Sequence, residues 1–291
     1  MPVNISGNIR KMQITTVDDG LIYTLPIGEN HLLMNELIGK TITLSFSGVI
    51  NCVHCAAKTK KSFQGGHCWR CFKSLAQCDQ CIIKPELCGF SKGECRDPEW
   101  GKNNCFKPHM IYVSQTGAES HKVGITRHME NTVSSRWLDQ GATTAIPVVI
   151  VQNRLLSGLV EVAFKEHISD RTNWRKMLKF VEADTNIDAT ITPLLENVKA
   201  SVESLQHEYG ADAIQWVNNA SPVFIEYPVV AGGYPEKVKS LNLDKTPSFS
   251  GELTGLKGQY LMFTDNKVIN LRKYAGYHIT ITEEEGESLS S

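Results

Sequence analysis

Nine cysteines lie between residues 52 and 105, and the spacing of the first four is typical of metal ligands. Cys52, Cys55, Cys68 and Cys71 follow the pattern C-x2-C-x12-C-x2-C. Two thiolates separated by two residues lie on a tight turn that directs both sulfurs at one ion, and a second turn completes a tetrahedron around Zn²⁺. We predict a structural zinc, because four thiolates leave no open coordination position. An iron–sulfur cluster is the alternative, since it also takes four thiolates.

The remaining five cysteines indicate a second metal site. Cys78 and Cys81 form a third C-x-x-C pair. The candidates for the other two ligands are Cys88, Cys95, Cys105 and His109. Cys95 and Cys105 lie in the polar, turn-rich sequence KGECRDPEWGKNNC, so we predict that they complete the site. Cys88 lies in KPELCGF and is also explained as a buried free cysteine. One or two zinc ions are therefore expected.

The cysteine-rich segment is basic, whereas the whole chain is not. Ten Lys and Arg residues and five acids lie between Cys52 and His109, a local charge of +5, while the whole chain carries −1. Four aromatic residues are interleaved with these charges: Phe63, Trp69, Phe72 and Trp100. Positive charge suits phosphate contacts and aromatic rings suit base stacking, so we expect DNA or RNA as a partner. The alternative is a solvated basic surface without a ligand.

The residues after this segment predict the elements of a small α/β module in the order β-β-α-β-α. Alternating apolar residues favour strands, and apolar residues at helical spacing favour an amphipathic helix at the end. A polar turn over residues 117–120 joins the first two strands as a hairpin. The predicted elements are strands over 110–114, 122–126 and 146–152 and helices over 132–140 and 155–168.

This module, over about residues 109–180, resembles the GIY-YIG nuclease family. Met110-Ile111-Tyr112 stands at the G-I-Y position, and Lys122-Val123-Gly124, followed by Thr126, stands at the Y-I-G position. The resemblance implies a helix arginine at Arg136 in SSRWLDQ and a metal-binding glutamate at Glu161 in SGLVEVAF. It also implies a later asparagine at Asn173. The implied catalytic residues are thus Tyr112, Lys122, Arg136, Glu161 and Asn173, with Mg²⁺ or Mn²⁺ at Glu161.

These residue types suffice for phosphodiester hydrolysis. A lone glutamate can hold Mg²⁺ while water and phosphate oxygens fill the rest of its shell. Arg136 can form two hydrogen bonds to a phosphate, and Tyr112 or Lys122 can act as the base if a neighbouring cation lowers its pKa. Two departures from the family pattern, Met110 for glycine and Lys122 for tyrosine, favour instead a nuclease fold kept as a non-catalytic scaffold.

Each of these residues also has a structural interpretation. Tyr112 fits a packed strand residue, and Glu161 fits the polar edge of an amphipathic helix. Arg136 can stack on the neighbouring Trp137 at the surface. Asn173 can cap the helix that begins NWRKML, which we favour over a catalytic role.

The whole chain also resembles an uncharacterised bacterial family, domain of unknown function 2797. The phrases KPELC, SRWLDQGA, SGLVEVAFKEHI, TNWRKML and GLKGQYL carry this resemblance from one end of the chain to the other. It implies one integrated architecture and no particular activity.

Both chain ends are rich in strand-like sequence, and we expect them to form one barrel-like β domain around the central modules. The predicted fold class is α+β: a zinc-knuckle segment and a GIY-YIG-like unit framed by this β domain. The predicted segments are an N-terminal β portion (1–50), a zinc-binding module (51–108), the GIY-YIG-like module (109–180), a helical segment (181–218), a C-terminal β portion (219–283) and a disordered tail (284–291).

Composition excludes several classes of protein. No run of 18 apolar residues exists, so no transmembrane helix and no membrane partner are expected. The N-terminus lacks the apolar core of a secretory signal. We therefore expect a cytoplasmic protein with reduced thiols rather than disulfides.

The sequence thus supports three hypotheses. The leading one is a zinc-containing nucleic-acid-binding protein that acts as a Mg²⁺-dependent GIY-YIG-like endonuclease. The second is a non-catalytic, zinc-stapled nucleic-acid-binding scaffold. The third is a protein-interaction or redox-sensing zinc protein, which only the odd ninth cysteine favours.

Overall fold

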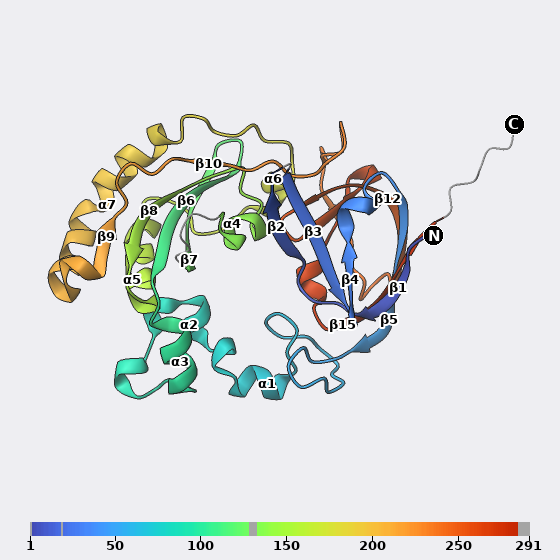
Figure 1. Ribbon diagram of the computed structural model, residues 1–291, viewed down its shortest axis with the longest axis horizontal. Helices are drawn as coiled ribbons and strands as arrows, with labels where there is room; N and C mark the ends of the chain where they lie inside the picture. Colours follow the sequence, from blue (N-terminus) through green and yellow to red (C-terminus); the bar gives the residue numbers. More distant parts are fainter. Residues whose placement is uncertain (1, 19, 128–132, 285–291) are drawn as a thin grey trace, which may run out of the picture. The chain divides into compact units, whose positions relative to one another are not determined.

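The computed structural model describes residues 2–18, 20–127 and 133–284, and the chain forms two compact units (Figure 1). Unit 1 contains Met1–Phe72, Leu178–Phe180 and Glu226–Ser291, and unit 2 contains Lys73–Met177 and Val181–Ile225. The fold is a mixed α+β fold that is rich in sheet, in agreement with the predicted class. The cysteine-rich segment 51–108 is divided between the two units after Phe72.

Unit 1 is built from both ends of the chain, because β1 and β15 pair antiparallel, with Ile5 opposite Ile281. Its larger sheet contains seven strands. Their order is β1 (Asn4–Asn8), β15 (Tyr277–Glu283), β5 (Thr41–Ile50), β12 (Ser248–Lys257), β13 (Tyr260–Phe263), β14 (Lys267–Asn270) and β11 (Lys239–Ser240). A second sheet contains β2 (Gln13–Val17), β3 (Gly20–Ile27) and β4 (Asn30–Leu33). The predicted barrel is not closed: in the described residues β1 and β11 are the open edges of the larger sheet.

Alternation along the strands explains how this sheet forms a core. In β5, Ile42 and Leu44 are fully buried, whereas Thr41 and Thr43, which alternate with them, are only half-buried. Successive side chains of a strand point to opposite faces, so one face of β5 is apolar. Each fully buried aliphatic side chain of this kind stabilises the fold by roughly 1.5–3 kcal/mol.

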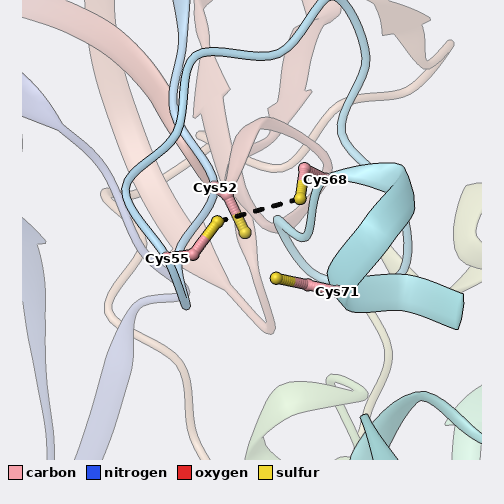
Figure 2. Close-up of side chains that lie close together, drawn as sticks. All are labelled: Cys52, Cys55, Cys68 and Cys71. Atoms are coloured by element: carbon pink, nitrogen blue, oxygen red, sulfur yellow. Dashed lines mark hydrogen bonds between the residues drawn. The ribbon is translucent and has the colours of Figure 1, made fainter. Parts of the chain in front are cut away.

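The first four cysteines follow β5. Cys52 and Cys55 lie in the loop after this strand, and Cys68 and Cys71 lie at the start of helix α1 (Trp69–Ser74) (Figure 2). Gly66 precedes the second pair and has a φ of +110°. A Cβ at Gly66 would collide with Val53 and with the carbonyl group of Ala275, so only glycine allows the loop to close here.

Unit 2 contains a five-stranded sheet whose central strand, β6 (His109–Gly117), is buried along its whole length. β6 lies between β7 (Ser120–Arg127) and β8 (Thr144–Val151), and both pairings are antiparallel. The other edge of β8 pairs with β9 (Ile214–Trp216) and β10 (Val223–Phe224).

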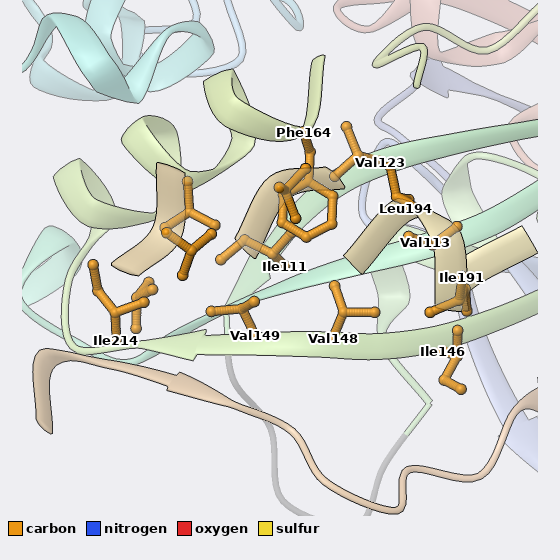
Figure 3. Close-up of a cluster of buried hydrophobic side chains, with 14 of the residues drawn as sticks. Ile111, Val113, Val123, Ile146, Val148, Val149, Phe164, Ile191, Leu194 and Ile214 are labelled. Carbon is orange, nitrogen blue, oxygen red and sulfur yellow. The ribbon is translucent and has the colours of Figure 1, made fainter. Parts of the chain in front are cut away.

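Two helices, α5 (Arg154–Lys165) and α7 (Asp188–Tyr209), bury their apolar faces against this sheet (Figure 3). Asn153 caps α5, because its side chain accepts a hydrogen bond of 3.0 Å from the backbone N–H of Leu156. The buried cluster contains Ile111, Val113, Val123, Val149, Leu156, Val160, Phe164, Leu194 and Val198, among others. The core thus fixes α5, and with it Glu161, against β6 and β7.

The predicted order β-β-α-β-α is present in the described residues. The helix predicted over 132–140 corresponds to α4 (Ser135–Asp139), which Ser134 caps and which ends before Gly141 at a φ of +69°. Residue 132 itself lies outside the described residues. The second predicted helix corresponds to α5.

The prediction of a helical segment over 181–218 is wrong at its end. Gly210 adopts a φ of +101°, which stops α7, and β9 follows and pairs with β8. The tail predicted as disordered lies outside the described residues, apart from residue 284. Among the described helices, none combines the length and the apolar composition that crossing a bilayer demands.

Candidate metal centre and charged cluster

The four sulfurs of Cys52, Cys55, Cys68 and Cys71 form a compact group in which all lie within 4.8 Å of one another (Figure 2). The Sγ atoms of Cys55 and Cys68 are 3.8 Å apart. Four sulfurs at about 2.3 Å from one ion, at the corners of a tetrahedron, also lie about 3.8 Å apart. The predicted cysteines therefore fit a structural zinc site.

The local backbone favours thiolates at this site. Burial raises the pKa of Cys52, but hydrogen bonds from the backbone of Cys55, Cys68 and His54 lower it to about 6. Cys71 shows the opposite effect, because burial and the three neighbouring thiols raise its pKa. A cation would neutralise this accumulation of negative charge.

The surface beside these cysteines carries aromatic rings and lysines, all within unit 1. The ring centroid of Trp69 lies 5.3 Å from that of Phe63 and 5.7 Å from that of Phe72, and Trp69 is 53% exposed. The Nζ of Lys61 lies 5.4 Å from the centroid of Phe63. We name Lys61, Phe63, Trp69 and Phe72 the aromatic patch.

The other predicted metal ligands are only partly brought together. Cys81, Cys95 and Cys105 line one small cavity in unit 2, and Cys88 lines it too. Cys78 is buried, and it is not among the lining residues. Cys88 is a candidate ligand that the sequence prediction does not assign to this site, although six residues separate it from Cys81 and six from Cys95.

Four of the five residues that the GIY-YIG resemblance indicates are linked electrostatically in the structure. Tyr112 lies on β6, Lys122 on β7, Arg136 on α4 and Glu161 on α5. Arg136 and Glu161 both influence the pKa of Tyr112 and that of Lys122, so the four side chains share one electrostatic environment. We name them the charged cluster.

Tyr112 is the most deeply buried residue of this cluster. Its side chain is fully buried, and its hydroxyl donates a hydrogen bond of 3.1 Å to Oε1 of Gln140. A Cβ at Gly124 would lie 2.6 Å from the hydroxyl oxygen of Tyr112, so the ring rests directly on the glycine of the second motif. Burial raises the pKa of Tyr112, and the nearby Arg136 lowers it only in part. A phenol in this state is a poor proton acceptor.

Burial shifts the pKa of Lys122 in the opposite direction. The side chain is 4% exposed, and burial lowers its pKa to about 8, an effect to which the nearby Arg136 adds. Glu161 counteracts this shift only in part. Burial therefore weakens the preference of the Lys122 side chain for its charged form, which is the form an exposed lysine keeps near neutral pH.

Glu161 is 9% exposed, and burial raises its pKa, although the ammonium groups of Lys165 and Lys122 oppose this effect. The Nζ of Lys165 lies 3.1 Å from Glu161 and 3.4 Å from Asp170. Two carboxylates therefore converge on one cationic group. Neither Lys165 nor Asp170 is among the residues that the sequence motifs indicate, although the i, i+4 spacing of Glu161 and Lys165 is typical of an ion pair on a helix.

Asn173, the fifth residue, is exposed, and its side chain accepts a hydrogen bond of 3.2 Å from the backbone N–H of Lys176. It thus caps α6 (Trp174–Met177), in agreement with the structural interpretation.

None of the curated proteins and none of the solved structures compared with this chain matches it, so the GIY-YIG resemblance rests on the motif residues alone. A family described as a protein of unknown function (DUF2797) matches residues 39–279. The match covers most of the chain, including the four-cysteine group and the charged cluster. The chain therefore belongs to the DUF2797 family.

Proposed function

We propose that this protein binds nucleic acid and cleaves phosphodiester bonds at the charged cluster with the help of a divalent cation. One observation carries the proposal: Tyr112, Lys122, Arg136 and Glu161 come from four different elements and share one electrostatic environment. Their order along the chain is also that of the GIY-YIG motifs, which supports the same reading.

Each residue has a chemical task in this proposal. The pKa of Lys122, about 8, suits it to accept a proton from the attacking water or to contact the scissile phosphate. Arg136 is exposed, so its guanidinium can reach a phosphate and form two parallel hydrogen bonds. Tyr112 positions the cluster by packing on Gly124.

The carboxylates fit a divalent cation. Lys165 holds its ammonium between Glu161 and Asp170, which is where an ion with oxygen ligands would bind. Glu161 and Asp170 would hold Mg²⁺ or Mn²⁺ in exchange for Lys165. The bound ion would neutralise charge on the phosphate and activate water.

The aromatic patch supports the nucleic-acid part of the proposal. Exposed rings stack on bases of any sequence, and adjacent lysines neutralise phosphates. Trp69 is exposed beside Phe63 and Phe72, and Lys61 lies over one of these rings. Zinc at the four-cysteine group would hold this loop in shape, because the segment has little apolar core of its own.

A non-catalytic nucleic-acid-binding protein is the second candidate, and specific observations favour it. Tyr112 is buried with a raised pKa, and Glu161 already has an ion pair with Lys165. Both features suit a scaffold whose former catalytic residues are now structural.

Cleavage assays separate the two candidates. Wild type, Glu161→Gln and Glu166→Gln would be incubated with labelled single-stranded, duplex and branched DNA and structured RNA, with Mg²⁺ or Mn²⁺. Glu166 is an exposed acid at the end of the same helix and is the matched control.

Cleavage by the wild type and Glu166→Gln, but not by Glu161→Gln, would support catalysis at the charged cluster. Binding without cleavage by all three proteins would overturn the catalytic proposal and leave the second candidate. Equal cleavage by all three would show that the activity does not come from this site.

A further inference from the structure

A small cavity in unit 2 is surrounded by thiols from four consecutive short elements. It measures about 20 Å³, and Cys81, Cys88, Cys95 and Cys105 line it together with Phe90 and Trp100. Cys81 lies on α2 (Gln80–Ile83), and Cys105 ends α3 (Pro98–Cys105). Cys88 and Cys95 follow the 3-10 turns η3 (Pro85–Leu87) and η4 (Phe90–Lys92). A space of this size admits one water-sized particle.

We propose that Cys81, Cys88, Cys95 and Cys105 hold a second structural zinc ion, independent of the four-cysteine group in unit 1. Thiolate sulfur is the preferred ligand of structural zinc, and four such ligands complete its shell. This inference does not rest on the proposed nuclease activity. It also replaces Cys78 of the sequence prediction by Cys88.

The four cysteines of this cavity are free thiols. The sulfurs are spread more widely than those of Cys52, Cys55, Cys68 and Cys71, and the Sγ of Cys95 donates a hydrogen bond to the carbonyl oxygen of Asp97, 3.2 Å away. Metal binding would release this hydrogen bond and draw the sulfurs together.

Arg154 provides an independent observation that points to negative charge at this cavity. It is the first residue of α5 and is half-buried. The guanidinium of Arg154 donates a hydrogen bond to the carbonyl oxygen of Ile82. Its Nε has no hydrogen-bond partner in the part of the chain that the structure describes. No carboxylate of the described residues forms an ion pair with it. A zinc ion with four thiolates carries a formal charge of about −2, which would balance this half-buried cation.

The position of the cavity indicates what the metal would stabilise. The turn η3 packs on α5 at Gly158, where a Cβ would collide with the backbone of Pro85 and Glu86. Cys88 follows η3 directly. Arg154 on α5 donates a hydrogen bond to the carbonyl oxygen of Ile82, which precedes η3 in the sequence. The segment from Cys81 to Cys105 contains several short turns and little regular structure. Four metal bonds would replace a hydrophobic core and fix this segment against the helix that carries Glu161.

Metal stoichiometry tests the inference. The full-length protein and the variants Cys88→Ser and Cys78→Ser would be purified without added metal, and zinc per chain would be measured by elemental analysis. We expect two zinc ions in the wild type, two in Cys78→Ser and one in Cys88→Ser. Cys88→His, which keeps a zinc-binding side chain, should retain two. The zinc held in unit 1 shows in each variant whether that unit is folded.

A wild type with one zinc ion per chain would overturn the inference. So would loss of zinc from Cys78→Ser with two ions retained in Cys88→Ser, because Cys78 would then be the ligand. Iron with inorganic sulfide in place of zinc would also overturn it. If Cys88→Ser is insoluble, replacement of zinc by Co²⁺ in the wild type decides the question. Two equivalents of Co²⁺ with thiolate-to-metal absorption support the second site, and one equivalent contradicts it.

Discussion

Lys122 illustrates, at the scale of a residue, how the burial of an ionisable side chain opposes stability. Its side chain is 4% exposed, and burial lowers its pKa from 10.5 to about 8. A buried ammonium is unfavourable, so a lysine in this position destabilises the fold whatever its role.

The variant Lys122→Met should therefore be more stable and inactive. We expect the free energy of unfolding at pH 7 to rise by about 1–3 kcal/mol, because the cost of burying the charge disappears. The folded pKa lies below the unfolded one, so the destabilisation is complete below about pH 8 and is relieved as the pH rises toward 10.5. Urea denaturation at pH 7 and pH 9.5 measures this difference.

Lys199→Met is the control for this prediction, because Lys199 is 66% exposed. Its effect should remain within about 0.5 kcal/mol. Lower stability of Lys122→Met at pH 7 would contradict the inference that burial of the Lys122 charge destabilises the fold.

His109 is a second buried group whose charge state matters. It is 1% exposed, its Nδ1 lies 2.7 Å from the carbonyl oxygen of Lys107, and its Nε2 has no hydrogen-bond partner among the described residues. Burial lowers its pKa to about 4, and the nearby Arg154 and Arg127 add to this effect. The folded protein therefore holds His109 neutral.

Stability should fall as the pH falls from about 6.5 to about 4, because the unfolded chain binds a proton that the folded chain excludes. Between pH 7 and pH 4.5, the wild type should lose on the order of 2 kcal/mol more than His109→Gln does. Thermal unfolding over this pH range provides the measurement, with the exposed His207→Gln as control. Parallel pH profiles for the wild type and His109→Gln would show that His109 is not responsible.

At the scale of elements, η3 packs closely against α5, the helix that carries Glu161. Gly158 brings the backbone of η3 against the helix, and any side chain there would collide with Pro85 and Glu86. Small residues permit this approach, and the protein interior has no room for extra atoms.

Gly158→Ala should consequently lower the free energy of unfolding by about 1–3 kcal/mol, although alanine favours helix more than glycine does. Denaturant unfolding measures the loss. Val162→Ala, on the exposed side of the same helix, should change stability by no more than about 0.5 kcal/mol. An increase in the stability of Gly158→Ala would mean that η3 does not pack on the helix in this way.

The loop that carries the aromatic patch makes a separate prediction. Trp69→Ala should weaken binding to single-stranded DNA or RNA by about 1–3 kcal/mol, because a stacking platform is lost. The slope of log K against log salt should not change, since no charge is removed. Fluorescence anisotropy measures both quantities, and Tyr209→Ala, a 40% exposed tyrosine at the end of α7, should have no effect. Unaltered affinity of Trp69→Ala would exclude the aromatic patch as the binding surface.

Local pattern was sufficient to predict some elements and not others. The hairpin and α5 follow from alternation and from apolar residues at helical spacing, and Ser134 and Gly141 mark the ends of α4. β9 was mistaken for helix, because a three-residue strand has no pattern of its own and forms only by pairing with β8. Tertiary pairing of this kind overrides local propensity.

Some residues of the candidate sites can also be predicted from local sequence, and others cannot. The four cysteines of unit 1 are predictable, because C-x2-C fixes two ligands on one local turn. Cys88 was not assigned, since its approach to Cys81 and Cys105 depends on three short turns whose directions the sequence does not specify. Asp170 and Lys165 meet Glu161 beyond the end of α5, where no motif indicated a partner.

At the scale of the whole molecule, each compact unit contains its own group of four thiols and its own candidate contact with nucleic acid. Unit 1 carries Cys52, Cys55, Cys68 and Cys71 beside the aromatic patch, and unit 2 carries the second thiol group and the charged cluster. Zinc in both units would support segments that are too polar to fold around a core. The aromatic patch and the charged cluster are the surfaces through which we propose that the protein binds nucleic acid.

The most direct test of that claim is a binding titration of the zinc-loaded full-length protein with labelled single-stranded and duplex DNA and RNA. It would be done without Mg²⁺ or Mn²⁺, so that cleavage does not interfere, and repeated between about 50 and 200 mM salt. We predict saturable binding to at least one of these nucleic acids, with affinity that falls linearly as log K against log salt. Absence of binding to every one of them at the lowest salt concentration would contradict the account.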